Sequence, residues 1–299
     1  MITRSSAESP QVLVLSGATR AVLGEGPVWD ERQQRLYWVD IERGELHQCR
    51  EDGSEPRYVQ LPGRLGCVVL RRDRPGLVAG LEREIVALTL EPLHIERLAA
   101  LDAQEPYVRC NDGKCDLEGR FWVGTCDARS SEAVGWLYRY TVAGEPVRTL
   151  GPCVCVNGPA FSPDGRRLYW VDSYQRVIHA AALDVAGKIS RPRIFTRFED
   201  PTWGYPDGLT CDAEGCVWVA HWGGARISRF SPSGELLAAI ALPVKQPSSC
   251  TFGGAGLRRL FISSAAIGLS SSGTAPAVDG ALLAVDLPVG GLPAGRYAG

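Results

Sequence analysis

The sequence has no apolar run that approaches the roughly 20 residues needed to cross a bilayer. Its first ten residues are polar and lack the apolar core of roughly 7–15 residues found in a secretory signal. No run of lysine and arginine marks a surface for nucleic acid or anionic lipid, and the formal net charge of the 299 residues is only −2. We therefore expect a cytoplasmic protein with neither nucleic acid nor membrane among its partners.

The cysteines do not follow the spacing of a zinc site. Neither the pair Cys110 and Cys115 nor the pair Cys153 and Cys155 has the CxxC spacing of a structural zinc centre. A disulfide framework is typical of short secreted chains, which this chain is not. Several of the ten cysteines lie within apolar strand patterns, so we expect reduced thiols in the core: Cys67, Cys211, Cys216 and Cys250.

Helical periodicity is also missing, because no stretch keeps it for three turns. Apolar segments are short and rich in β-branched and aromatic residues, and the chain's 34 glycines and 20 prolines punctuate them. Hydrophobic residues make up 45% of the chain and charged residues 22%, which excludes a disordered protein and predicts a packed one. The sequence therefore predicts a nearly all-β fold.

The chain repeats itself with a period typical of propellers and solenoids. Residues 25–30 (EGPVWD) lead into 35–40 (RLYWVD), and residues 157–162 (NGPAFS) lead into 167–172, which are again RLYWVD. Each unit continues into a third and usually a fourth β segment. Weaker copies begin near four further positions, which makes six units: Gly66, Asn111, Asp207 and Ser249. Six units of four strands predict a six-bladed β-propeller with four-stranded blades.

The termini are predicted to meet in the last blade. Residues 11–15 precede the first repeat, and we expect them to pair with 281–287 and so close the ring. The predicted organisation has a flexible N-terminus at 1–10 and one propeller domain at 11–290. A surface loop is expected at 265–278 within that domain, and a C-terminal tail with a mobile end at 291–299.

The first residue of each innermost strand is expected to point at the propeller axis, so six positions form a ring: Glu25, Gly66, Asn111, Asn157, Asp207 and Ser249. Four of these side chains carry oxygen donors suited to a divalent cation. Asn-Gly and Asp-Gly are also common turn dipeptides, so each of them alone is explained by a turn. Glu has no such turn chemistry, and the convergence on one axis favours a metal site.

The chain resembles the family of gluconolactonase, regucalcin (senescence marker protein) and luciferin-regenerating enzyme over about residues 12–287. The resemblance rests on seven short motifs: LGEGP at 23–27, RCNDG at 109–113, GT at 124–125, NG at 157–158, SPDG at 162–165, YPDG at 205–208 and AHWGG at 220–224. The sequence departs from the family where Cys126 follows Thr125, because methionine is the more usual residue there. Cys126 is a candidate pocket residue, although we expect a buried, inert thiol.

The resemblance implies one divalent metal ion, whether calcium, zinc, magnesium, manganese or iron. Its ligands would be Glu25, Asn157 and Asp207, and Asp207 would also act as the general base. Arg109 and Asn111 match family residues that contact the substrate.

The loop that follows Thr125 is expected to border the pocket entrance. Asp127 and Glu132 in this loop are its candidate substrate-binding residues.

The resemblance implies a metal-dependent lactonase that hydrolyses a sugar lactone, such as glucono-, xylono- or arabinono-lactone, to the aldonic acid. Two alternatives stay open: another hydrolase on the same scaffold, acting on aryl esters or phosphotriesters, and a calcium-binding propeller without activity. We expect a monomer or a weak homo-oligomer, because a closed propeller needs no partner for its stability.

Overall fold

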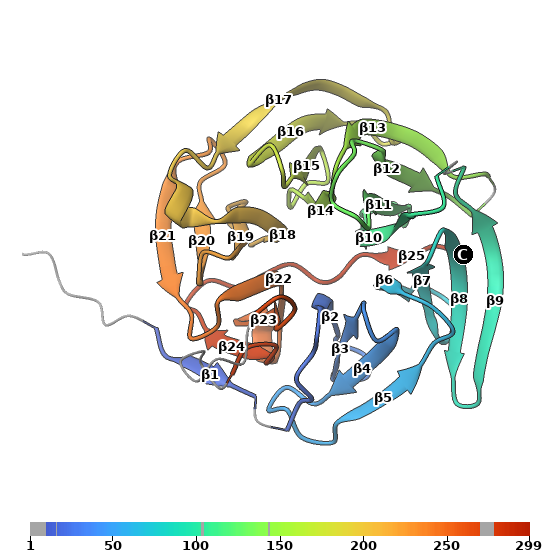
Figure 1. Ribbon diagram of the computed structural model, residues 1–299, viewed down its shortest axis with the longest axis horizontal. Helices are drawn as coiled ribbons and strands as arrows, with labels where there is room; N and C mark the ends of the chain where they lie inside the picture. Colours follow the sequence, from blue (N-terminus) through green and yellow to red (C-terminus); the bar gives the residue numbers. More distant parts are fainter. Residues whose placement is uncertain (1–9, 16, 103–104, 143, 270–277) are drawn as a thin grey trace, which may run out of the picture.

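The computed structural model describes residues 10–15, 17–102, 105–142, 144–269 and 278–299. Within these ranges the chain forms six sheets arranged radially about a central axis (Figure 1). The helical segments in the described ranges are two short 3-10 turns, η1 (Pro201–Trp203) and η2 (Ala255–Leu257). The predicted six-bladed, all-β propeller is therefore confirmed. The predicted flexible residues 1–9, and most of the predicted loop at 265–278, lie outside the described ranges.

The first three blades follow one another along the chain, each from the inner to the outer strand. Blade 1 holds β2 (Gly24–Asp30), β3 (Arg35–Asp40), β4 (Glu45–Cys49) and β5 (Arg57–Gln60). Blade 2 holds β6 (Leu65–Arg71), β7 (Leu77–Leu81), β8 (Glu84–Leu90) and β9 (Leu93–Ala100). Blade 3 holds β10 (Val108–Cys115), β11 (Phe121–Asp127), β12 (Gly135–Tyr140) and β13 (Val147–Cys153).

The last three blades complete the ring. Blade 4 holds β14 (Val156–Phe161), β15 (Arg167–Asp172), β16 (Val177–Leu183) and β17 (Ile189–Arg197). Blade 5 holds β18 (Tyr205–Cys211), β19 (Val217–Trp222), β20 (Arg226–Phe230) and β21 (Leu236–Ala241). Blade 6 holds β22 (Gln246–Gly253), β23 (Arg259–Ala265), β24 (Leu283–Asp286) and the N-terminal β1 (Val12–Val14).

Strand β1 closes the ring as predicted. It pairs antiparallel with β24, with Val12 opposite Val285, and forms the outer edge of blade 6 (Figure 1). The last blade thus combines an N-terminal strand with three strands from residues 246–286, which closes the ring without a covalent link.

The blades pack through the aromatic residues of the repeat. Trp38 and Trp170 occupy the same place in the two RLYWVD copies, and each stacks on a histidine of the next strand, with ring centroids 5.2 Å and 4.8 Å apart. Between blades, Trp29 stacks on Phe261 at 5.7 Å. Buried aromatic area of this kind supplies much of the energy that holds the sheets together.

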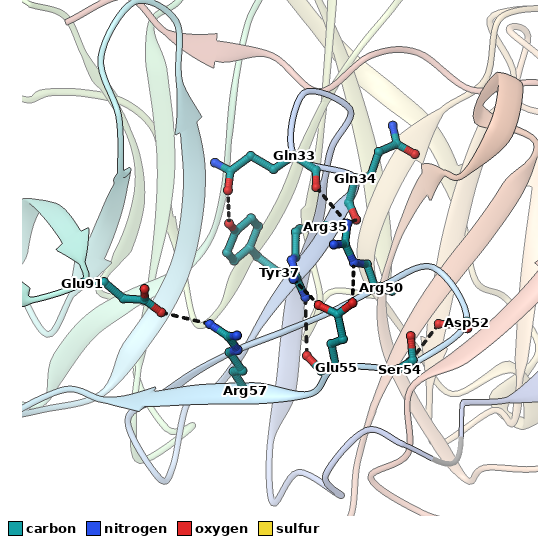
Figure 2. Close-up of polar contacts among 10 residues, drawn as sticks. All are labelled: Gln33, Gln34, Arg35, Tyr37, Arg50, Asp52, Ser54, Glu55, Arg57 and Glu91. Carbon is teal, nitrogen blue, oxygen red and sulfur yellow. Dashed lines mark hydrogen bonds and ion pairs between the residues drawn. The ribbon is translucent and has the colours of Figure 1, made fainter.

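A surface network of charges lies on the outer part of blades 1 and 2 (Figure 2). Glu55 pairs with Arg35 and with Arg50, and Arg57 pairs with Glu91 of the next blade at 3.1 Å. The side chains of Arg57 and Glu91 are exposed to solvent, so this link between blades contributes little to stability.

The C-terminal segment differs from the mobile tail that the sequence predicts. It crosses the end of the central tunnel (Figure 1), and β25 (Arg296–Tyr297) adds a fifth strand to blade 2 by pairing parallel with β6. The Tyr297 ring is buried and stacks on Tyr140 at 5.7 Å. This prediction was wrong because the open inner edge of β6 accepts a strand that shares no repeat pattern with the blades.

Candidate active site

All six innermost strands have a local irregularity of register near the predicted axial position. The shift falls between Glu25 and Val28 in β2, between Asn157 and Ala160 in β14, and between Pro206 and Leu209 in β18. The other three innermost strands carry it at the equivalent place. Such bulges re-aim a side chain relative to its sheet. They explain how one residue per blade can turn from the pleat toward the axis.

A cavity of about 320 Å³ lies at the end of the tunnel where these bulges occur. Four of the six ring residues line it: Glu25, Asn111, Asn157 and Asp207. The three predicted metal ligands therefore line the same cavity, although they come from blades 1, 4 and 5. The predicted substrate contacts Arg109 and Asp127 line the same cavity.

The two acids of this group, Glu25 and Asp207, are buried, and burial makes the ionised form of each carboxyl group unfavourable. Burial and the negative charge of Asp112 raise the pKa of Glu25 to about 8. Burial, followed by the charge of Glu25, raises the pKa of Asp207 well above its ordinary range. Arg109 offsets both effects only in part. The two carboxylates together form a centre that favours protons or a cation.

The amides of Asn111 and Asn157 are oriented by a chain of hydrogen bonds. Asn157 donates from Nδ2 to Ser173 Oγ at 2.9 Å, while its Oδ1 accepts from Asn111 Nδ2 at 2.7 Å. Arg109 Nη1 donates to Asn111 Oδ1 at 2.8 Å. The hydrogen bond from Asn157 Nδ2 to Ser173 fixes the orientation of the Asn157 amide. The Oδ1 of Asn157 keeps a second lone pair, with which it could bind a cation.

Arg109 is almost fully buried at the cavity. The residue is 8% exposed, and its Nη1 also donates to the carbonyl of Cys110 at 2.9 Å. Within the described ranges, its Nε has no hydrogen-bond partner and is itself shielded from solvent. The guanidinium therefore supplies a fixed positive charge beside Glu25 and Asp207.

The loop after β11 is arranged differently from the prediction. The carboxylate of Asp127 accepts from Ser131 Oγ at 2.9 Å and from the Glu132 backbone N–H at 2.8 Å, so it holds the loop together. Glu132 accepts from Tyr107 at 3.1 Å and pairs with Arg129 at 3.2 Å. The structure thus brings Asp127 to the cavity wall but not Glu132, whose carboxylate these two neighbours hold.

Asp112 belongs to the RCNDG motif at 109–113, but the sequence predicts no role for it. It is buried below the cavity, where it accepts from the backbone N–H of Gly158 at 3.1 Å and lies 3.8 Å from Lys114 Nζ. It therefore ties blade 3 to the bulge that presents Asn157. Its position directly after Asn111 was the only sequence signal for this role.

An aromatic rim was also missed by sequence reasoning. Tyr174 and Tyr205 lie with ring centroids 6.1 Å apart, and both line the cavity together with Trp222. The two tyrosines are 44% and 45% exposed, so their faces are open to a ligand. Tyr174 lies just after the YWVD segment and Tyr205 begins the YPDG motif, but their convergence needs contacts between blades 4 and 5.

The fold and the site define a class: a six-bladed propeller with a polar cavity at one end of its axis, lined by buried acids and oriented amides. Within the described part of the chain, no helix is long and apolar enough to span a bilayer. The chain belongs to the SMP-30/Gluconolactonase/LRE-like family, whose model matches residues 23–266.

Known proteins similar to this chain include two lactonases. The L-arabinolactonase of Azospirillum brasilense is 37% identical over 94% of both chains. The 6-deoxy-6-sulfogluconolactonase of Pseudomonas putida is 37% identical over 82% of this chain and 84% of its own length. Among solved structures, a luciferin-regenerating enzyme aligns with a TM-score of 0.90 and 30% identity, covering 97% of this chain and 99% of that one.

Proposed function

We propose that this protein is a divalent-metal-dependent lactonase that hydrolyses an aldono-lactone to the aldonic acid. The observation that carries the proposal is the meeting of Glu25, Asn157 and Asp207, from three separate blades, on the wall of one cavity. The names of the similar proteins support a lactonase, since two of them act on sugar lactones by name.

The donor set fits a hard or borderline divalent cation. Two carboxylates with raised pKa values are stabilised when a cation replaces their protons, and an amide oxygen completes three protein donors. Within the described residues, no cluster of three or more His, Cys, Asp or Glu side chains is placed to hold a metal, so Asn157 is essential to this assignment. A neighbouring structure described as a calcium-binding regucalcin also favours a divalent ion.

When bound, such a cation would polarise the lactone carbonyl and lower the pKa of a coordinated water. Asp207 then accepts the proton of the water that attacks the carbonyl carbon. The same proton is returned to the ring oxygen as the ring C–O bond breaks, which gives the free hydroxyl of the aldonic acid.

The remaining cavity residues fit a sugar lactone. The guanidinium of Arg109, which lines the cavity, can stabilise the lactone oxygens, which carry more negative charge as the tetrahedral centre forms. The open faces of Tyr174 and Tyr205 suit the C–H face of a sugar ring. These contacts orient the substrate, while Asp207 moves the proton.

The variant Asp207→Ala tests the proposal. We expect lactone hydrolysis to fall by at least about 10²-fold while the fold is kept, because both a ligand and a proton acceptor are lost. Initial rates on a panel of glucono-, arabinono- and xylono-lactone, with and without chelator, would measure this, and circular dichroism would check the fold. Asp164→Asn, in an exposed turn outside the cavity, is the matched control.

The same panel separates the alternatives. Aryl esters or phosphotriesters hydrolysed faster than every sugar lactone would favour another hydrolase. Calcium binding with no turnover of any substrate would favour a binding propeller. A chelated protein, or an Asp207→Ala variant, that keeps most of its lactonase rate would exclude the proposed mechanism.

A further inference from the structure

Two cysteines meet on the wall of the cavity. Cys126, near the end of β11 in blade 3, and Cys155, just before β14 in blade 4, form an isolated antiparallel bridge between the blades. All ten cysteines lie in the described ranges, and nine of them are buried; Cys155 is the partly exposed one. Both thiols line the cavity, so small solutes that enter it can reach them.

The register of this bridge suits a covalent bond. The backbone N–H of Asp127 donates to the carbonyl of Val154 at 2.9 Å, which places the ladder hydrogen bond beside the two cysteines rather than between them. Opposed residues of this non-hydrogen-bonded type have Cα atoms about 4.5 Å apart, within the range of about 4.4–6.8 Å that disulfides span. The two thiols are close enough for each to shift the pKa of the other, downward for Cys126 and upward for Cys155.

We propose that Cys126 and Cys155 form an oxidative modification site at which a peroxide that enters the cavity converts the two thiols into a disulfide joining blades 3 and 4. The class of modifying ligand is a small peroxide, such as hydrogen peroxide. The inference rests on the geometry of the pair and does not depend on the substrate of the enzyme.

The chemistry balances in two steps. The sulfur of one cysteine attacks one peroxide oxygen, the O–O bond breaks, and that cysteine becomes a sulfenic acid as an alcohol or water leaves. The sulfur of the other cysteine then attacks the sulfenic sulfur, the S–O bond breaks, and water leaves with the thiol proton. Two thiols thereby lose two electrons, which the peroxide takes up.

The bond would disturb the amides that face the cavity. Cys155 Sγ lies 3.4 Å from Asn111 Nδ2 and 3.6 Å from Asn157 Nδ2, and Cys126 Sγ lies 3.8 Å from Asn111 Oδ1. Drawing the sulfurs into covalent contact alters their positions against both amides. If the proposed function holds, oxidation should therefore lower lactonase activity, and reduction should restore it.

Treatment of the full-length reduced protein with hydrogen peroxide tests the inference. We expect the loss of two of the ten thiols, an intact mass lower by two hydrogens, and a peptide linked through residues 126 and 155 after digestion without reductant. Cys126→Ser and Cys155→Ser should each abolish the linked peptide. Cys153→Ser, which removes a buried thiol two residues from Cys155, should leave it in place.

Peptide mapping of the wild-type protein decides the question even if a variant fails to fold. Sulfinic or sulfonic acid at Cys155 with no linked peptide, unchanged thiols, or a disulfide between other cysteines would each overturn the inference. Lactonase rates before oxidation, after it, and after dithiothreitol form a separate measurement. A linked peptide in a protein that hydrolyses no lactone would reject the proposed function and leave the cysteine site standing.

Discussion

Burial decides the ionisation of the acids at the centre of the molecule. Glu25 is 5% exposed and shares its surroundings with Asp112 and Asp207, so each added negative charge raises the cost of the next. Ordinary proteins avoid this arrangement unless a proton or a cation neutralises the charge. In the metal-free protein, ionisation of these buried carboxylates is therefore unfavourable, and solution experiments can detect its effect on stability.

We predict that Glu25 makes the metal-free protein less stable as the pH rises. The pKa of Glu25 is about 8 in the folded state, above its ordinary 4.5, so between these pH values the folded state keeps a proton that the unfolded state has released. The free energy of unfolding therefore decreases with pH across this window. Melting temperatures at pH 5 and pH 8 should show wild type losing stability relative to Glu25→Gln, by on the order of a few degrees.

Divalent cations provide the control for this prediction. A cation that binds the folded state should raise the melting temperature of wild type most at pH 8, where Glu25 is ionised, and should raise that of Glu25→Gln far less. Parallel pH profiles of the two proteins would contradict the assignment of the raised pKa to Glu25.

At the scale of the element, the bulges of the innermost strands place the site. Gly26 has φ of 51°, a left-handed conformation that a residue with a side chain adopts only at a cost. A Cβ added at Gly26 would meet its nearest neighbour at 3.7 Å, which is ordinary contact. The requirement for glycine is therefore in the backbone of the bulge and not in the space around it.

We predict that Gly26→Ala lowers the free energy of unfolding by about 1 kcal/mol and weakens metal binding, because the bulge that aims Glu25 relaxes. Gly256→Ala is the matched control, since Gly256 has φ of 64° and open space around it but lies outside the cavity. Urea unfolding and calorimetric titration with a divalent cation would measure the two effects. Equal cation affinity in both variants would show that the bulge does not aim Glu25.

At the scale of the whole molecule, the C-terminal segment holds several blades together. Residues 292–295 line a small cavity of about 80 Å³ at the far end of the tunnel, shared with Asp112 and Lys114. Beyond it, Arg296 pairs with Asp30 of blade 1 at 2.5 Å, and Tyr297 packs between blades 2 and 3. The segment therefore covers the end of the axis opposite to the candidate active site.

We predict that Tyr297→Ala destabilises the protein by about 3 kcal/mol, because a buried aromatic ring is lost. Tyr58→Ala, at a site 59% exposed, should cost less than about 1 kcal/mol. Chemical denaturation of both variants measures the difference. Equal stability of the two would mean that the C-terminal strand adds nothing to the ring.

The repeat of the sequence was enough to predict the six blades and the closure by β1, and it predicted that Glu25, Asn157 and Asp207 lie near one another, which agrees with their presence in the lining of one cavity. These features follow from a pattern that recurs along the chain, and equivalent positions of equivalent blades must point the same way. The place of Asp127 on the cavity wall agrees with the prediction that the loop beginning at this residue borders the pocket entrance.

Other features were decided only by the tertiary structure. The sequence does not show that Tyr107 and Arg129 hold Glu132 away from the cavity, that β25 finds the edge of β6, or that Cys126 faces Cys155. Each of these depends on a contact between segments that no repeat relates. Such contacts form at the strand edges and side chains that the assembled blades leave unpaired. These unpaired groups are defined only once the ring has closed.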